Sequence, residues 1–136
     1  MEKKNLDWKH IGFAYHTTDY RYVADYKDGK WQEGYMSDSP NIVLNECAGI
    51  MQYCQEVFEG LKAYETADGR IVTFRSDLNA DRMYHSAERM EMPPFPKERF
   101  IEAVEKVVKA NEAWVPPYGS GATLYLRPYM YASSPV

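Results

Sequence analysis

MQYCQEVFEGLKAYET, residues 51–66, is the stretch that decides the fold we expect. Around its first half, apolar residues recur at the spacing of one face of an α-helix. These residues are Ile50, Cys54, Val57 and Phe58. Asn45 and Glu46 suit a helix start, because a short side-chain oxygen accepts the first free N–H groups and an anion meets the positive end. Gly60 suits the left-handed residue that ends a helix, so we predict a helix that stops there.

The second half of the stretch has the two-residue period of a β-strand. Residues 61–66 alternate, an Ala-Asp-Gly turn follows, and residues 70–75 form a second extended run. This pattern predicts a β-hairpin. Tyr53 and Phe58 lie where the helix end would meet the sheet. We expect a pocket wall at this joint, although core packing alone also explains two aromatic residues there.

Composition limits the class of protein. The chain has 136 residues, 45% hydrophobic and 26% charged, values typical of one globular domain with a buried core. The net charge is −4, and no cluster of lysine and arginine alternates with aromatic residues, so nucleic acid is not an expected partner. No apolar run approaches the ~20 residues that span a bilayer, and the N-terminus lacks the apolar core of a secretory signal. We therefore expect a cytoplasmic protein without a membrane partner.

The other elements complete an α+β pattern. They are a hairpin over residues 20–36 with an Asp28-Gly29 turn, a helix after Ser76-Asp77, a helix over residues 97–114 and a strand over residues 122–131. The apolar faces expected for the two helices are Ala80, Met83, Ala87 and Met90 in the first, and Ile101, Val104 and Val108 in the second. This order predicts a mostly antiparallel sheet packed against helices.

The ends of the chain look different from its middle. Residues 1–12 are polar and are expected to form a loosely held arm, so we place the small α+β domain at residues 13–136. The final SSPV is neither a cap nor a tail. It resembles a cut in a linker, with more protein expected beyond it.

Two arginines are candidates for binding an anion. Arg75 lies between a predicted strand and a predicted helix, where a guanidinium could hold a phosphate or carboxylate with two hydrogen bonds. A surface ion pair with Asp77 or Asp81 is the simpler explanation from the residues alone. Arg127 shares a strand face with Tyr125, which suits an anion clamp. The solvent-facing side of an edge strand explains that pair as well.

The residues by themselves define no catalytic centre. The three histidines are scattered, no metal spacing is present, and no glycine-rich phosphate loop occurs. Lys62 is expected to be a surface lysine, and Glu56 and Glu59 are expected on a solvated helix face. Cys47 and Cys54 would lie two turns apart on the predicted helix, about 10 Å, which is too far for a disulfide.

Five segments occur in order along the chain. They are Phe13 with Thr18-Asp19, QEVFEGLKAY (55–64), FRSDLNADRM (74–83), NEAWVP (111–116) and TLYLRPY (123–129). Together they resemble the N-terminal, smaller domain of the branched-chain aminotransferases. These are class IV pyridoxal-phosphate enzymes related to D-amino acid aminotransferase. The resemblance runs from residue 12 to residue 135, and the order and spacing of the five segments make it specific. One departure is Ala14, where relatives often carry glycine.

The resemblance implies roles for six residues. Arg75 matches the arginine that contacts the cofactor phosphate, and Arg127 matches the arginine beside the substrate carboxylate. The aromatic wall around the aliphatic substrate side chain is implied at Phe13, Tyr53, Phe58 and Tyr125. One methylene changes binding in such a pocket by only about 1–3 kcal/mol, so leucine, isoleucine and valine should all fit. The pocket should also admit the 2-oxo acids, including 2-oxoglutarate as amino-group acceptor.

The resemblance also implies parts that these residues do not supply. In the family, the lysine that carries pyridoxal 5'-phosphate as a Schiff base lies in the larger C-terminal domain, as does most of the phosphate cradle. The 136-residue chain is therefore expected to be inactive alone, and the intact enzyme is expected to be a homodimer. Two alternatives stay open: another class IV aminotransferase or lyase of the D-amino acid type, and a stand-alone module that binds a small anion or a protein through Tyr125 and Arg127.

Overall fold

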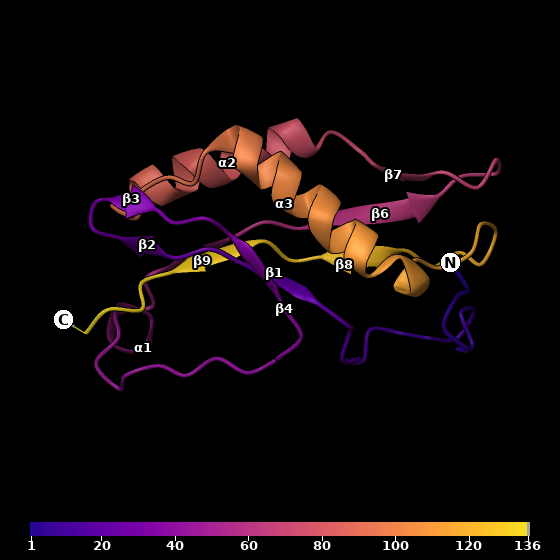
Figure 1. Ribbon diagram of the computed structural model, residues 1–136, viewed down its shortest axis with the longest axis horizontal. Helices are drawn as coiled ribbons and strands as arrows, with labels where there is room; N and C mark the ends of the chain where they lie inside the picture. The colour runs from indigo at the N-terminus through magenta and orange to yellow at the C-terminus, as the bar shows by residue number, and fades with distance from the viewer. Residues whose placement is uncertain (136) are drawn as a thin grey trace.

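Figure 1 shows the computed structural model, which describes residues 1–135. The strands are β1 (Arg21–Val23), β2 (Tyr26–Lys27), β3 (Lys30–Trp31), β4 (Tyr35–Ser37), β5 (Glu56–Phe58), β6 (Leu61–Glu65), β7 (Ile71–Thr73), β8 (Leu124–Leu126) and β9 (Tyr129–Tyr131). The helices are α1 (Gly49–Tyr53), α2 (Ser76–Arg89) and α3 (Lys97–Ala110), with a short 3₁₀ helix at Glu112–Trp114. Helices combined with antiparallel strand pairs confirm the predicted α+β class. Val136, the last residue of the predicted domain, lies outside the described residues.

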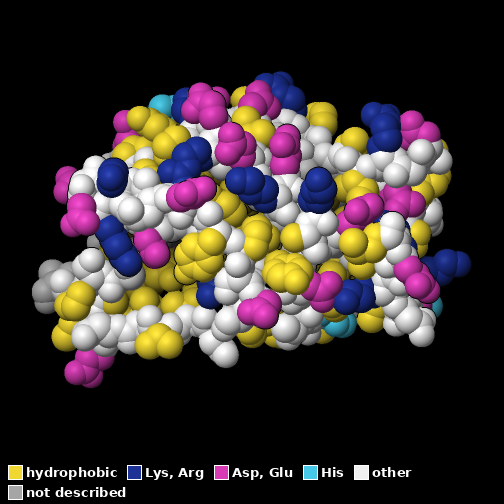
Figure 2. All heavy atoms as spheres, in the orientation of Figure 1, with side chains coloured by type: hydrophobic (Ala, Val, Ile, Leu, Met, Phe, Trp, Pro, Cys, Tyr) yellow, Lys and Arg dark blue, Asp and Glu magenta, His cyan; other side chains and the backbone are white. Residues whose placement is uncertain are grey.

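The core lies between the two long helices and one face of the strands. Its buried residues are Ala80, Met83 and Ala87 of α2, Phe100, Val104 and Val108 of α3, Val57, Leu61, Ala63, Leu126 and Met130 of the strands, and Met92 and Val115 of the connecting segments. In Figure 1, α2 lies above the strands and α3 runs from beside α2 across β6 and β8. Figure 2 shows charged side chains of both signs over these helices and hydrophobic side chains gathered over the strands below them. The amphipathic faces predicted for α2 and α3 are therefore the core faces, although Met90, which follows the last residue of α2, and Ile101 are only partly buried.

The predicted helix ending at Gly60 is wrong in its second half. Helix α1 ends at Tyr53, and Cys54 follows in the left-handed conformation with φ 51°. Residues 56–58 form β5 instead, paired with β9. Gly60 has no left-handed φ. Asn45 does not cap α1 either, because its side-chain oxygen accepts the N–H of Cys47 in a turn before the helix, at 2.8 Å.

Residues 56–58 form a strand and not a helix because the apolar spacing of this stretch is compatible with both. Val57 and Leu61 belong to a helical spacing, but they also alternate with exposed residues as a strand requires. A helix of five residues has little stability of its own. Pairing with β9 supplies long-range hydrogen bonds that an extended backbone can use and a helix cannot, so the strand is formed.

Both predicted hairpins are confirmed. The first consists of the ladders β1–β4 and β2–β3, and its Asp28-Gly29 turn has φ of 53° and 77°, as two-residue hairpin turns prefer. The second is β6–β7, with Gly69 at φ 81° in the turn. The predicted start of α2 after Ser76-Asp77 is wrong, because the helix already begins at Ser76. Arg75 occupies the N-cap position in a left-handed conformation, and no side chain caps that helix end.

The predicted strand 122–131 is two strands, β8 and β9, separated at Arg127 and Pro128. Strand β9 pairs with β5 and β8 pairs with β6, and the register runs straight through the gap. Phe58 pairs with Tyr129, and Leu61 pairs with Leu126, so Glu59 lies opposite Pro128 and Gly60 opposite Arg127. Proline has no N–H to donate, which interrupts the ladder at this level. We call β5, β6, β8 and β9 together the interrupted ribbon.

No helix within the described residues is long and apolar enough to cross a membrane.

Candidate functional site

The interrupted ribbon has a core face and an open face. Side chains alternate without a break from residue 56 to residue 63, with Val57, Glu59, Leu61 and Ala63 buried. Phe58 and Lys62 lie on the opposite, exposed side, which we call the open face. Lys62 pairs with Tyr125 across the ladder, which brings Tyr125 to the same face. The open face therefore presents aromatic and basic side chains on paired strands.

Four of the six predicted site residues meet on this face. Arg127 donates hydrogen bonds to the hydroxyl oxygen of Tyr125 from Nε at 3.0 Å and from Nη2 at 2.8 Å. Its guanidinium lies 4.3 Å from the ring centre of Phe58, a cation–π contact. The ring of Phe13 packs against Tyr125 with 5.7 Å between centroids. Segments far apart in the sequence thus form one aromatic cluster around one guanidinium.

The arrangement leaves donors free for a ligand. The Tyr125 oxygen accepts both bonds from Arg127, so its own hydrogen can be donated outward. Arg127 keeps its Nη1 donors and remains exposed. Phe13 and Phe58 are also mostly exposed, at 86% and 58%. The cluster is thus an apolar surface that carries free hydrogen-bond donors, and its two phenylalanine rings are exposed.

Tyr53 and Arg75 are not joined to this cluster by any hydrogen bond, ion pair or ring contact among residues 1–135. Tyr53 ends α1 and is 67% exposed. Arg75 binds Asp77 with two hydrogen bonds, from Nε at 2.9 Å and from Nη2 at 2.8 Å. This contact raises the pKa of Arg75 and lowers that of Asp77. The ion pair considered for Arg75 from the residues alone is therefore present, and its contact with a phosphate stays a prediction.

A shallow pocket of about 240 Å³ opens beside Tyr125. It is lined by Gly60, Leu61, Lys62, Tyr64, Phe74, Asn79 and Tyr125. Pockets for small ligands usually measure about 300–1,000 Å³, so this one fits part of a ligand or needs a further wall. Lys62 gives the lining a positive charge. Sequence reasoning did not assign Lys62, Tyr64 or Phe74 to a site.

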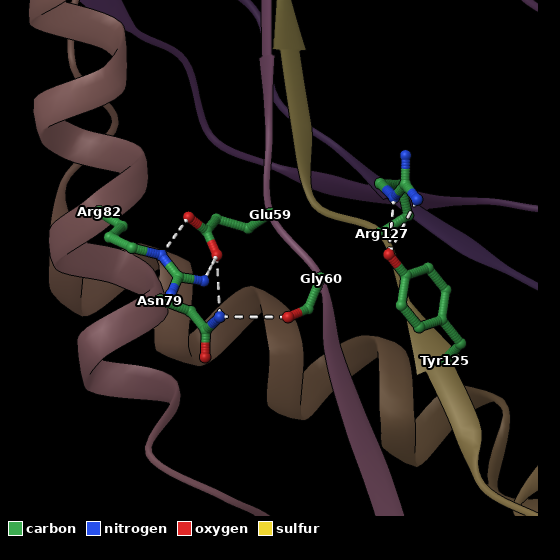
Figure 3. Close-up of polar contacts among 6 residues, drawn as sticks. All are labelled: Glu59, Gly60, Asn79, Arg82, Tyr125 and Arg127. Carbon is green, nitrogen blue, oxygen red and sulfur yellow. Dashed lines mark hydrogen bonds and ion pairs between the residues drawn. The ribbon is translucent and has the colours of Figure 1, made fainter.

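Glu59 is a buried carboxylate, which corrects its expected place on a solvated helix face. Its side chain points toward α2, where Arg82 donates to Oε1 at 2.9 Å and Asn79 donates to Oε2 at 2.9 Å (Figure 3). Burial opposes its charged form, but these hydrogen bonds outweigh burial and lower the pKa of Glu59. The strand alternation with Val57 and Leu61 was the signal that could have revealed its burial. We call Glu59, Asn79 and Arg82 the Glu59 clamp.

Within residues 1–135, no cluster of three or more histidine, cysteine, aspartate or glutamate side chains is placed to hold a metal ion. Cys47 and Cys54 are both free thiols and exposed. The two do not share a helix, because α1 covers only Gly49–Tyr53.

Comparison with solved structures shows which fold this chain shares. The branched-chain aminotransferase of the archaeon Thermoproteus uzoniensis, solved with norvaline, matches with a TM-score of 0.61 at 24% identity, over 86% of this chain and 35% of that one. The Escherichia coli branched-chain aminotransferase matches with a TM-score of 0.62 at 21% identity, over 85% and 33%. A further branched-chain aminotransferase, complexed with N-(5'-phosphopyridoxyl)-L-glutamate, matches with a TM-score of 0.63 at 26% identity, over 84% and 33%. The chain therefore has the fold of a part of these aminotransferases. No family model matches it.

Comparison of sequences identifies the relatives of this chain at higher identity than the structural matches. The branched-chain-amino-acid aminotransferase of Haemophilus influenzae is 50% identical over 127 residues, and that of Helicobacter pylori is 45% identical. The aligned part is 93% of this chain in both and 37% of each relative. The methionine aminotransferase of Arabidopsis thaliana is 43% identical over 97% of this chain. The chain is thus homologous over nearly its whole length to branched-chain aminotransferases, as the motifs predicted, and spans about a third of their length.

Proposed function

We propose that this chain forms the small domain of a pyridoxal-phosphate-dependent branched-chain aminotransferase. The full-length enzyme would transfer the amino group of leucine, isoleucine or valine to 2-oxoglutarate. The observation that carries the proposal is the 50% identity over 93% of the chain to a protein of that name. The cluster of Phe13, Phe58, Tyr125 and Arg127 agrees with it, because an aliphatic amino acid needs an apolar wall and an α-carboxylate needs donors.

The open face would bind the substrate in two ways. Phe13 and Phe58 cover its aliphatic side chain, and Tyr53 completes that wall in the assembled enzyme. The Tyr125 hydroxyl and the free donors of Arg127 bind a carboxylate group of the amino acid or of the 2-oxo acid. A guanidinium held over the Phe58 ring is positioned before the ligand arrives, so less conformational entropy is lost on binding.

Pyridoxal 5'-phosphate supplies the electron sink for the chemistry when it is bound. Arg75 suits one contact with its phosphate, because it stands at the positive N-terminal end of a 14-residue helix and its Nη1 donors are not used by Asp77. The Asp77 carboxylate beside it opposes a second anion. These residues therefore fit a supporting contact to the phosphate and not a whole cradle, so we place the cradle and the covalently bound lysine in the rest of the full-length enzyme.

The proposal extends to assembly and location. Aromatic side chains on and near the open face are exposed, including Phe13, Phe58 and Phe74, at 86%, 58% and 79%. An apolar surface of this kind favours a covering protein surface. We propose that a larger domain and a second subunit provide it, in a cytoplasmic homodimer. Branched-chain amino acids and their 2-oxo acids are the proposed small-molecule partners.

The experiment is an amino-transfer assay of the full-length protein. L-Leucine, L-isoleucine, L-valine, L-methionine and D-leucine are compared as donors, with 2-oxoglutarate as acceptor. The proposal expects turnover of the three branched L-amino acids. Preference for D-leucine would favour the D-amino acid type, preference for L-methionine would change the substrate, and the absence of all transfer would contradict an aminotransferase. The isolated 136-residue chain serves as the control and is expected to be inactive.

A further inference from the structure

Glu59 joins three parts of the fold. Its carboxylate accepts hydrogen bonds from Asn79 and Arg82 of α2, and its N–H donates to the carbonyl of Pro128 across the ribbon at 2.8 Å. Asn79 also donates to the carbonyl of Gly60, at 3.3 Å. The backbone of Glu59 and Gly60 is therefore held from the helix on one side and from the partner strand on the other.

Gly60 is the surface against which the Tyr125 hydroxyl lies. A Cβ atom at residue 60 would be 2.5 Å from Tyr125 Oη and 3.2 Å from its Cζ. Arg127, opposite Gly60 in the ribbon, donates two hydrogen bonds to the same hydroxyl (Figure 3). The position of the Gly60 backbone thus limits where that hydroxyl can be, and the hydroxyl in turn orients the guanidinium.

Glu59 itself cannot touch a ligand on the open face. It is 5% exposed and points to the core side, whereas its neighbours Phe58 and Gly60 belong to the open face. Its influence must pass through the backbone. Asn79 lies four residues after Arg75, one helical turn, so the same carboxylate also anchors the end of α2 that carries Arg75.

We infer that Glu59 is a positioning residue for the Tyr125–Arg127 pair. Held by Asn79 and Arg82, its carboxylate fixes the Gly60 backbone and through it the donors that meet the substrate carboxylate. The inference rests on the proposed function for the identity of that substrate, and on the described geometry for everything else. A role in stability alone is the competing explanation, because changing a buried carboxylate that is bonded to a guanidinium also destabilises a fold.

A double-mutant cycle in the full-length enzyme separates the two roles. Glu59→Gln should lower kcat/KM for L-leucine with 2-oxoglutarate about tenfold, through KM more than kcat, because ground-state binding of the carboxylates is loosened. In a Tyr125→Phe background the same change should cost less than about twofold, because the hydroxyl through which Glu59 acts is gone. Glu102→Gln, the same change at an exposed position of α3, which packs on the core side of the ribbon, is the matched control and should leave kcat/KM unchanged.

A second variant covers the case in which Glu59→Gln does not fold. Asn79→Ala keeps the Glu59–Arg82 contact and removes only the bonds to Glu59 and to the Gly60 carbonyl. It should show the same dependence on the Tyr125 hydroxyl. Equal losses in both backgrounds, or a lower unfolding temperature with unchanged kcat/KM, would overturn the inference and leave a structural role.

Crystal structures of the wild type and of the Glu59→Gln variant, or of Asn79→Ala in its place, make the test independent of activity. If the wild-type enzyme transfers no amino group, the proposed function fails, and the structures still decide the inference. Loss of the two Arg127–Tyr125 hydrogen bonds in the variant supports it. An unmoved pair refutes it.

Discussion

Asn111 provides the sharpest prediction about stability. Its side chain is 2% exposed and makes three hydrogen bonds. It donates to the carbonyl of Tyr20 at 2.8 Å and of Val107 at 2.9 Å, and it accepts the N–H of Tyr20 at 3.0 Å. The side chain therefore attaches the start of β1, just after the segment that carries Phe13, to the end of α3. We predict that Asn111→Ala loosens this attachment.

The expected magnitude follows from those bonds. A net contribution of roughly 1 kcal/mol for each bond, with the two Tyr20 groups left short of partners, gives a loss of about 2–4 kcal/mol in the free energy of unfolding. For a domain of this size that corresponds to a fall of roughly 10 °C in the unfolding temperature. Asn111→Asp should cost more than Asn111→Ala, because a carboxylate would face two carbonyl oxygens instead of donating to them.

Urea unfolding, followed by circular dichroism, measures these losses. Asn45→Ala is the matched control, since its exposed side chain makes one hydrogen bond to the N–H of Cys47 and should cost less than about 0.5 kcal/mol. A loss of less than about 0.5 kcal/mol for Asn111→Ala would refute the reasoning. Removing a buried side chain that makes three hydrogen bonds should destabilise the fold by more than that. A milder effect of Asn111→Asp than of Asn111→Ala would refute it as well.

Three further predictions concern the site. In the full-length enzyme, Arg75→Ala should weaken retention of the cofactor, measured as cofactor content after gel filtration. Arg70→Ala, which breaks an exposed ion pair with Asp68, is the control. Unchanged cofactor retention in Arg75→Ala would exclude Arg75 from the phosphate contact. Tyr125→Phe should reduce the rate of amino transfer strongly and change the unfolding temperature little. Tyr118→Phe, in an exposed loop, is the control and should change neither quantity. An unchanged rate in Tyr125→Phe would exclude Tyr125 from the site. The pKa of Glu59 lies below its ordinary 4.5, so its ionised form stabilises the fold above that pH and the contribution is lost as the pH falls through the lowered pKa. The difference in unfolding free energy between wild type and Glu59→Gln should therefore shrink from about pH 6 to about pH 3, and a constant difference would show that the charge is not responsible.

Local signals made much of the fold predictable. The Asp28-Gly29 turn needs positive φ at both positions, and its flanking strands follow from it. Helices α2 and α3 have a 3.6-residue apolar period sustained over 14 residues each, which no strand could satisfy. The pairing of Tyr125 with Arg127 was also predictable, because residues two apart on a strand share a face. In each case the decisive interactions lie within a few residues of one another.

The tertiary structure decided what those signals left ambiguous. Residues 56–58 are a strand because β9, more than 70 residues later, pairs with them. Glu59 is buried because α2 brings Arg82 and Asn79 to it. Phe13 and Phe58 join the Tyr125–Arg127 pair because distant segments meet on the open face. Periodicity along a chain records which face a residue takes, but the partners on that face come from elsewhere in the sequence, and only folding brings them together.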